Sequence, residues 1–276
     1  MNDILFELRG VVYSYLGKFP ALGGVEITIT KGHRISVIGA NGSGKSTLLH
    51  LLDGLIFADQ GSVRFLGGEL NEARFRDESF SRDFRRTVGL VFQNPDIQLF
   101  CPTVKDDIVF GPLHLGFPKT EIRRRLEEIT VKLEIEYLLD RSPQQLSIGE
   151  KRKVAIASSL IIDPDILLLD EPTAGLDPLT TRHIIDLLNE AHNAGKTIIV
   201  SSHDLHFVEE ISDIIHVFNR EKHIVRSGPA DVILNDMALL QQNNLVHIHS
   251  HRHQGKIHVH AHVHSDHHGG NEHNHE

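Results

Sequence analysis

Cysteine and long apolar runs are both scarce in this 276-residue sequence. Cys101 is the single cysteine, so an internal disulfide framework is excluded. No apolar run approaches the roughly 18 residues that a membrane-spanning helix needs, so we expect no inserted segment. The acidic start, residues 1–7, lacks the basic region of a secretory signal, and the single thiol is compatible with a reducing cytosol.

Basic residues are also in deficit, with 28 Lys+Arg against 37 Asp+Glu and a formal net charge of -9. This balance argues against a protein that binds nucleic acid through bulk electrostatics. Histidine is abundant instead, since there are 21 and 12 of them lie in residues 247–276. The sequence therefore predicts an acidic globular body followed by a low-complexity, histidine-rich tail.

The first motif that carries chemistry lies between a β-rich run, residues 34–38, and a helical run, residues 45–52. It reads Gly39-Ala40-Asn41-Gly42-Ser43-Gly44-Lys45-Ser46 and matches the phosphate-loop pattern G-x-x-x-x-G-K-[ST]. Backbone N–H groups of such a loop surround phosphate oxygens at the positive end of the following helix. We expect Lys45 to reach the β- and γ-phosphates and the Ser46 hydroxyl to bind Mg²⁺.

A pair of carboxylates, Asp170 and Glu171, ends the apolar run 166–169. A continuous apolar run is typical of a strand in a parallel sheet that is covered on both faces. Carboxylates at the end of such a strand suit a metal ion or a reacting water. We expect Asp170 to bind Mg²⁺ through water and Glu171 to polarise the water that attacks the γ-phosphate.

With these motifs in place, residues 4–230 resemble the ATP-binding cassette (ABC) ATPases. Four further segments fit that family in order: Gln93 as the Q-loop glutamine, Leu146-Ser147-Ile148-Gly149-Glu150 as the signature, Asp177 in the D-loop and His203 as the switch histidine. Tyr15 sits where the family places an aromatic that stacks on adenine, with Tyr13 as the alternative. Six short motifs in one order are far more specific than any one of them.

The resemblance implies an ATP site shared between two copies of the chain. Glu171, His203 and Gln93 would be catalytic, and Ser46, Gln93 and Asp170 would serve Mg²⁺. One chain would bind the nucleotide through Tyr15, Gly39, Ala40, Asn41, Gly42, Ser43, Gly44, Lys45, Ser46, Thr47, Gln93 and Asp170. The other chain would contribute Ser147, Gly149, Glu150 and Asp177. ATP would close the dimer and hydrolysis would open it.

The signature segment departs from the usual L-S-G-G-Q at two positions. Ile148 replaces a glycine, and because a β-branched residue does not readily adopt positive φ, we expect a negative φ there. Glu150 replaces a glutamine, which removes an amide donor and weakens the expectation of a ribose contact at that position.

The resemblance also implies the fold. We expect an α/β P-loop NTPase with a RecA-like parallel sheet core, an N-terminal antiparallel β subdomain and an α-helical subdomain over about residues 97–160. The nucleotide-binding domain would cover residues 1–235, and a C-terminal extension would cover 236–276 with the tail at 247–276. Within the helical part, Thr103 predicts a helix cap with Asp106. The spacing of Ile122, Leu126, Ile129 and Leu133 predicts one apolar face of a helix.

The sequence around the Q-loop glutamine distinguishes between branches of the family. Residues 92–100, with Pro102-Thr103-Val104 and Phe110-Gly111-Pro112, resemble the ATPases of energy-coupling-factor importers, especially the cobalt/nickel subgroup. In that group the ATPase dimer lies on the cytoplasmic face of the membrane and docks on transmembrane coupling and substrate-binding subunits. We expect docking near residues 94–100, and a charge at Leu99 or Phe100 to disrupt it.

Two other functions stay open. One is a vitamin importer ATPase of the same group. The other is a soluble ABC ATPase that acts on nucleic acid or ribosomes, which the single cassette and the negative charge disfavour.

The tail alternates histidine with other residues on both sides of Gln254-Gly255. A two-residue turn there would pair His251 with His258, His249 with His260 and His247 with His262, with all six imidazoles on one face. Neutral imidazole binds divalent nickel, cobalt or zinc. The alternative is a tail without a hairpin, which would still bind metal.

Overall fold

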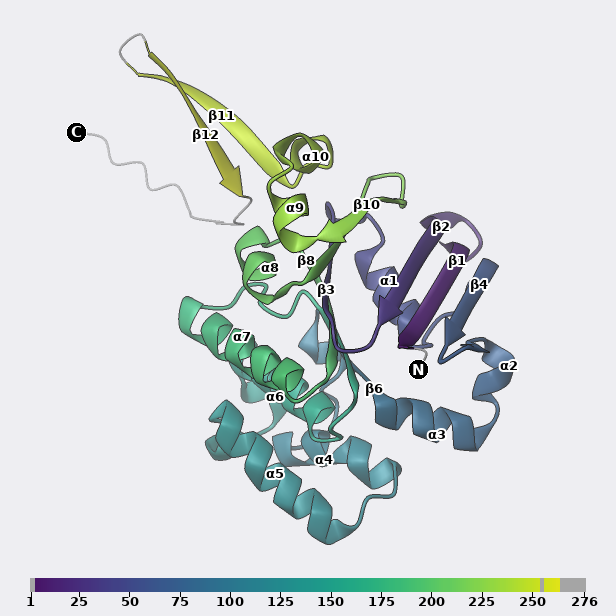
Figure 1. The fold of residues 1–276 in the computed structure, drawn as a ribbon. Helices are drawn as coiled ribbons and strands as arrows, with labels where there is room; N and C mark the ends of the chain where they lie inside the picture. The colour runs from purple at the N-terminus through teal and green to yellow at the C-terminus, as the bar shows by residue number, and fades with distance from the viewer. Residues whose placement is uncertain (1–2, 254–255, 264–276) are drawn as a thin grey trace, which may run out of the picture.

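The computed structural model describes residues 3–253 and 256–263, with side chains up to residue 246. Its strands, shown in Figure 1, are β1 (Ile4–Tyr15), β2 (Phe19–Thr30), β3 (Arg34–Ile38), β4 (Gln60–Phe65), β5 (Gly68–Glu69), β6 (Val88–Val91), β7 (Ile166–Asp170), β8 (Thr197–Ser202), β9 (Ile214–Phe218), β10 (Ile224–Pro229), β11 (Val246–His253) and β12 (Lys256–Val263). Its α-helices are α1 (Lys45–Leu52), α2 (Glu72–Phe75), α3 (Glu78–Thr87), α4 (Val104–His114), α5 (Lys119–Leu133), α6 (Ile148–Leu160), α7 (Pro178–Asn193), α8 (Leu205–Ile211), α9 (Ala230–Leu234) and α10 (Met237–Gln242).

The central sheet has the strand order β10-β9-β3-β8-β7-β6, and its strands are parallel except for β10 at one edge. Every residue of β7 is buried. Ile166 and Leu168 belong to the core that contains α1 and the antiparallel sheet, whereas Leu167 and Leu169 belong to the core on the helical side. The expected parallel sheet with both faces covered is confirmed.

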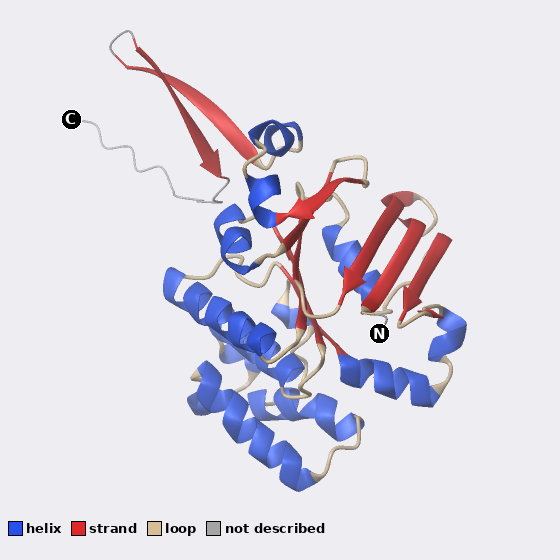
Figure 2. Cartoon of the chain, viewed as in Figure 1, coloured by secondary structure: helices blue, strands red, loops and turns tan. Residues whose placement is uncertain are grey.

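An antiparallel sheet with the order β2-β1-β4-β5 packs beside the first core (Figure 2). The β-rich runs 4–8, 25–29 and 61–65 of the sequence predict short strands in this sheet. In the structure β1 and β2 extend to 12 residues each and meet at the pair Tyr15 and Phe19. This turn end of the hairpin lies at the nucleotide cavity described below.

The helical part contains α4, α5 and α6. The Thr103 side chain accepts a hydrogen bond from the Asp106 N–H at 3.2 Å, which confirms the expected cap of α4. The stripe along α5 is buried throughout, as expected, at Ile122, Leu126, Ile129 and Leu133.

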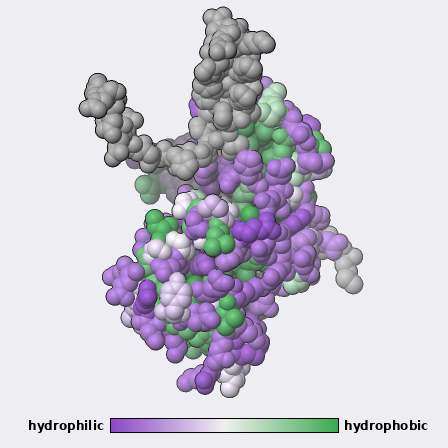
Figure 3. Space-filling view, turned by 90° about the vertical axis from the view of Figure 1, so that its left-hand side faces the viewer, coloured by the Kyte–Doolittle hydropathy of each residue, from purple (hydrophilic) through white to green (hydrophobic). Residues whose placement is uncertain are grey.

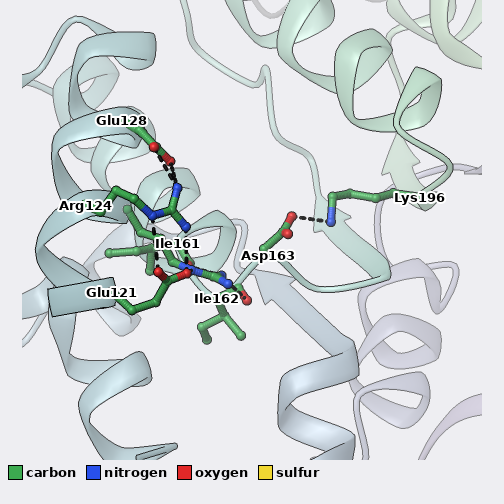
Figure 4. A network of polar contacts seen from close by, with 8 residues as sticks. Glu121, Arg124, Glu128, Ile161, Ile162, Asp163 and Lys196 are labelled. Carbon is green, nitrogen blue, oxygen red and sulfur yellow. Dashed lines mark hydrogen bonds and ion pairs between the residues drawn. The ribbon is translucent and has the colours of Figure 1, made fainter. Parts of the chain in front are cut away.

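Charged side chains pair along α5 and reach the chain that follows α6 (Figure 4). Arg124 lies between Glu121 and Glu128, with 2.7 Å from each carboxylate to the guanidinium. Arg125 donates to the carbonyl of Ile162 at 2.8 Å. Helix α5 is therefore joined to the chain that follows α6 by a polar contact as well as by its apolar stripe.

The C-terminal strands β11 and β12 form an antiparallel hairpin after α10. The register pairs His247 with His262, His249 with His260 and His251 with His258, as the alternation predicted. The side chains of these six histidines lie outside the described part of the structure.

Nothing in the described ranges forms a helix long and apolar enough to span a membrane. On the face drawn in Figure 3, hydrophobic side chains stand in small groups among hydrophilic ones.

Candidate nucleotide site

The phosphate loop joins β3 to α1, and its curvature depends on glycine. Gly44 immediately precedes α1 with φ +108°, and a Cβ there would lie 2.4 Å from the carbonyl oxygen of Ala21. Both the backbone angle and the close approach of β2 exclude a larger residue. The loop thereby leads directly into the start of α1, the helix end that favours an anion.

Lys45 is buried at the base of this loop. Its Nζ donates to the Gly39 carbonyl at 2.8 Å and lies 3.6 Å from a carboxylate oxygen of Glu171. Burial lowers the pKa of Lys45, and the neighbouring carboxylates of Glu171 and Asp170 oppose this shift. A cation already removed from water here is suited to meet phosphate oxygens.

The two acidic residues at the end of β7 are both buried, with Asp170 2% and Glu171 5% exposed. The Ser201 hydroxyl donates to Asp170, and the N–H of Glu171 donates to the carbonyl of Ser201 at 3.1 Å. His203 Nδ1 lies 2.8 Å from the second carboxylate oxygen of Glu171. Glu171 has φ +46°, a conformation that costs free energy for a side chain with a Cβ. The structure thus brings Lys45, Glu171 and His203 together.

A cavity of about 370 Å³ opens above the loop. Its walls include most of the expected nucleotide residues, namely Tyr15, Asn41, Gly42, Gly44, Lys45, Ser46, Thr47, Gln93 and Glu171. The remaining expected residues of the same chain lie outside its lining: Gly39, Ala40, Ser43, Asp170 and His203. Phe19 and Lys222 line it as well, and sequence reasoning missed both.

The aromatic end of the cavity is formed by the β1–β2 turn. Tyr15 is 39% exposed, and its hydroxyl lies 3.3 Å from Thr47 Oγ1. Tyr13 packs against the Tyr15 ring at a centroid distance of 5.0 Å and does not line the cavity. Of the two tyrosines, Tyr15 is thus the one on the cavity wall, and the exposed Phe19 lines the same cavity.

The residues present fit a nucleotide with Mg²⁺. The Ser43 hydroxyl is buried without a hydrogen-bond partner, as expected for a loop that binds phosphate oxygens. Ser46 and Gln93 provide neutral oxygen ligands on the cavity wall, and Asp170 lies at the neighbouring strand end. Oxygen donors of this kind suit Mg²⁺, which supplies charge neutralisation to a transferring phosphate when bound.

Among the side chains that the structure describes, no group of three or more His, Cys, Asp or Glu is arranged to hold a metal ion. A protein-only metal site in the body therefore has no support, and Mg²⁺ would be bound together with the phosphates.

The loop that carries Gln93 is tied to α6. The side-chain amide of Gln98 donates to the Ala155 carbonyl at 2.8 Å and to the Ser158 hydroxyl at 2.8 Å. Arg152 donates to the Phe92 carbonyl at 2.9 Å. Sequence reasoning missed Gln98 and Arg152, because an isolated Gln or Arg gives no signal of a contact about 60 residues away.

The signature segment caps α6. The Ser147 side chain accepts from the Glu150 N–H at 3.3 Å, and Glu150 accepts from the Ser147 N–H at 2.8 Å, which forms a capping box. The hydrogen bonds that the Ser147 N–H and hydroxyl donate to the Glu150 carboxylate lower the pKa of Glu150, which also accepts a bond from Tyr137 at 3.1 Å. Ile148 is 63% exposed with no positive φ, as predicted.

Neither the signature residues nor Asp177 line the cavity of their own chain. Asp177 caps α7, where it accepts from the Thr180 N–H at 2.9 Å. The Thr180 hydroxyl holds the pKa of this carboxyl below its ordinary value. The four residues expected to act across a dimer are thus absent from the cavity walls within one chain.

The expectation for the docking segment is wrong at one position. Leu99 is 7% exposed and belongs to the hydrophobic core, so it is a packing residue. The next residue, Phe100, is 64% exposed, and its ring packs edge-on against the ring of Phe110 with 4.9 Å between the centroids. Ile97 is exposed to the same extent. In this segment the exposed apolar side chains are therefore Ile97 and Phe100, and Phe100 contacts the exposed Phe110.

The phosphate loop, the buried Lys45 and the Glu171–His203 pair define a P-loop ATPase. Residues 22–174, more than half of the chain, match the ABC transporter family. The chain belongs to that family and is one of its ATP-binding, ATP-hydrolysing proteins.

Two relatives show the similarity over nearly the whole length. The nickel import ATP-binding protein NikO of Rhodobacter capsulatus is 49% identical over 244 residues, which cover 87% of this chain and 95% of NikO. The energy-coupling factor transporter ATP-binding protein EcfA of Methanothermobacter thermautotrophicus is 40% identical, with 87% of this chain and 76% of EcfA covered.

Solved structures agree on the fold. The cbiO1 protein of Clostridium perfringens, part of the ABC transporter complex cbiONQ, has a TM-score of 0.73 at 33% identity, with 88% of this chain and 96% of that chain covered. The cassette MJ0796, in a dimeric post-hydrolysis state with ADP and Pi, has a TM-score of 0.73 at 28% identity and covers 82% of this chain and 99% of its own. The expected ABC ATPase fold is confirmed.

Proposed function

We propose that this chain is the ATP-hydrolysing subunit of an importer for a divalent metal ion, nickel or cobalt. The observation that carries the proposal is that one continuous segment, residues 93–100, runs from the nucleotide cavity to the protein surface. Gln93 lines the nucleotide cavity, Gln98 is bonded to the signature helix α6, and Phe100 is exposed on the surface. A movement of Gln93 on nucleotide binding would thus reach a membrane partner directly.

Two chains would enclose two ATP molecules. In each site Tyr15 would stack on adenine, the phosphate loop and Lys45 would bind phosphates, and Ser46, Gln93 and Asp170 would serve Mg²⁺. Glu171 would polarise the attacking water, with His203 orienting it and facing the γ-phosphate. Ser147, Gly149 and Asp177 would come from the second chain. The exposure of Ser147 and Ile148 at the start of α6 supports this, because the N-terminus of a helix favours an anion.

The membrane partners would dock on the apolar surface Ile97, Phe100 and Phe110. An apolar surface next to a moving loop is suited to a helix of another subunit. The partners proposed are transmembrane coupling and substrate-binding subunits, with this chain peripheral on the cytoplasmic face.

The cargo is the finer part of the proposal. The similarity to NikO supports nickel. The similarity to the energy-coupling factor transporter protein EcfA supports the same group of importers, within which a vitamin importer is the alternative. The alternative of another class, a soluble ATPase acting on nucleic acid, has the net charge of -9 against it.

The test is to purify this chain with its membrane partners in lipid vesicles and to measure ATP turnover with nickel, cobalt, zinc or manganese outside. Nickel or cobalt should raise turnover, and the Phe100→Asp complex should lose this response. Equal turnover with every ion would contradict the metal cargo, and stimulation by RNA alone would favour the nucleic-acid alternative.

The tail would bind nickel or cobalt through His247, His249, His251, His258, His260 and His262. The hairpin register places these residues pairwise opposite one another. Truncation after Val246 should remove most nickel binding at pH 7.5 and leave basal ATPase activity within about twofold, since the cavity uses none of these side chains. Undiminished nickel binding by the truncated chain would contradict this role.

A further inference from the structure

Lys222 lies in the turn between β9 and β10, far along the chain from the phosphate loop. Its ammonium nevertheless donates to the carbonyl of Gly42, in the middle of that loop. The same side chain lines the nucleotide cavity together with Asn41, Gly44 and Lys45. None of the nucleotide motifs includes this residue.

The turn itself is attached to the loop's supporting strand. The N–H of Gly23 in β2 donates to the carbonyl of Lys222 at 3.0 Å. Lys222 also has φ +70°, a left-handed conformation that glycine adopts freely and a lysine adopts only at a cost. A turn position that favours glycine carries a lysine whose side chain reaches the loop.

Charge in the cavity makes the contact informative. Among the residues that line it, Lys45 and Lys222 are the two cations and Glu171 is the anion. Lys45 is already engaged with the Gly39 carbonyl and with Glu171. A polyphosphate brings several negative charges, so a second ammonium at the cavity wall lowers the cost of bringing it there.

We propose that Lys222 is a nucleotide-positioning residue of the ATPase. It holds the outer bend of the phosphate loop through the Gly42 carbonyl and adds positive charge beside the phosphates. Its effect is therefore specific to the di- and triphosphate part of the ligand and acts on binding more than on the chemical step.

The experiment measures binding of ATP (with EDTA), ADP and adenosine to the full chain by calorimetry, and ATP turnover separately. Lys222→Gly removes the cation and suits the positive φ, so the fold should be kept or stabilised. We expect Kd for ATP and ADP to rise about tenfold, the size of one lost charge-assisted contact. Adenosine binding should be unchanged, KM should rise and kcat should change by less than about threefold.

Four comparisons make the result decisive. Lys222→Asn also tolerates left-handed backbone and should match Lys222→Gly, whereas Lys222→Arg should keep the affinity within about threefold. Arg226→Gln, an exposed charge change on β10, should leave Kd unchanged. Added salt should weaken ATP binding less in Lys222→Gly than in the wild type. Wild-type ATP and ADP affinity in Lys222→Gly, or equal loss of adenosine binding, would overturn the proposal.

Discussion

The phosphate-loop side and the signature side of the proposed shared ATP site are built in opposite ways. At the phosphate loop, Lys45, Asp170 and Glu171 are buried, and their partners come from the same chain. At the signature, Ile148 is 63% exposed and Ser147 and Glu150 satisfy each other in a capping box. The phosphate-loop side is a preorganised interior in which charged side chains are buried at a cost in folding free energy. The signature side is a stable surface that needs no second chain in order to fold.

The largest effect is expected when a carboxylate on each side is replaced by an amide. Glu171→Gln should lower ATP turnover by about 10²- to 10³-fold, because the general base is lost while size is kept. ATP binding should persist and a closed dimer should accumulate, as measured by a coupled assay and by gel filtration with ATP.

The matched control is Glu150→Gln. An amide also closes a capping box, so turnover should change by less than about threefold. A loss of turnover in Glu150→Gln equal to that in Glu171→Gln would remove the distinction between a catalytic interior and a self-satisfied surface.

The second test separates packing from docking at adjacent residues. Leu99→Ala should lower the free energy of unfolding by about 2–5 kcal/mol, because it leaves a cavity in the core. Phe100→Ala should cost under about 1 kcal/mol and instead weaken association with membrane partners. Urea unfolding and co-purification measure the two effects. A large loss of stability in Phe100→Ala would assign it to the core.

These two neighbours show where sequence reasoning reached its limit. The order of motifs predicted the phosphate loop, the carboxylate pair and the parallel sheet, because glycine geometry and continuous apolar runs are local signals. Whether Leu99 is buried and Phe100 exposed depends on how the loop around Gln98 packs against α6. No local sequence pattern predicts this packing. Helix α3 was not predicted either, since its apolar residues, Phe80 and Phe84, are too few to show a period.

The same limit applied to the cavity. Tyr15 was found because its position relative to the phosphate loop is part of a family pattern. Phe19 and Lys222 reach the cavity from a hairpin and a distant turn, and only tertiary structure brings them there.

The third test uses pH. Asp53 follows α1, is 4% exposed and accepts a hydrogen bond from Arg85 at 2.6 Å. Burial raises the pKa of Asp53 from 3.8 to about 6, and Arg85 offsets part of this shift. A raised folded-state pKa means stability that is fully present below about pH 4 and lost as pH rises through about 6.

The unfolding free energy of Asp53→Asn relative to the wild type should therefore increase by about 2 kcal/mol between pH 4 and pH 7. The control is again Glu150→Gln, which keeps the capping box and should show no such rise. Glu150→Asn would break the capping box and is therefore unsuitable. A flat difference for Asp53→Asn would mean that Arg85 fully compensates the burial of this charge.

The smallest effect is expected at the N-terminus of α6. Ser147→Ala removes the hydroxyl that accepts from the Glu150 N–H, so the free energy of unfolding should fall by about 1 kcal/mol. Ser147→Thr keeps the hydroxyl and the cap, and should stay within about 0.5 kcal/mol of the wild type. If this surface also completes the site of a second chain, Ser147→Ala should lower turnover more than its loss of stability explains, while Ser147→Thr should not. Mixing Ser147→Ala chains with Lys45→Ala chains sharpens the point, because each mixed dimer has one site with both defects and one site with neither. Recovery of activity on mixing supports a site shared between chains, and its absence would place all of the catalytic residues within one chain.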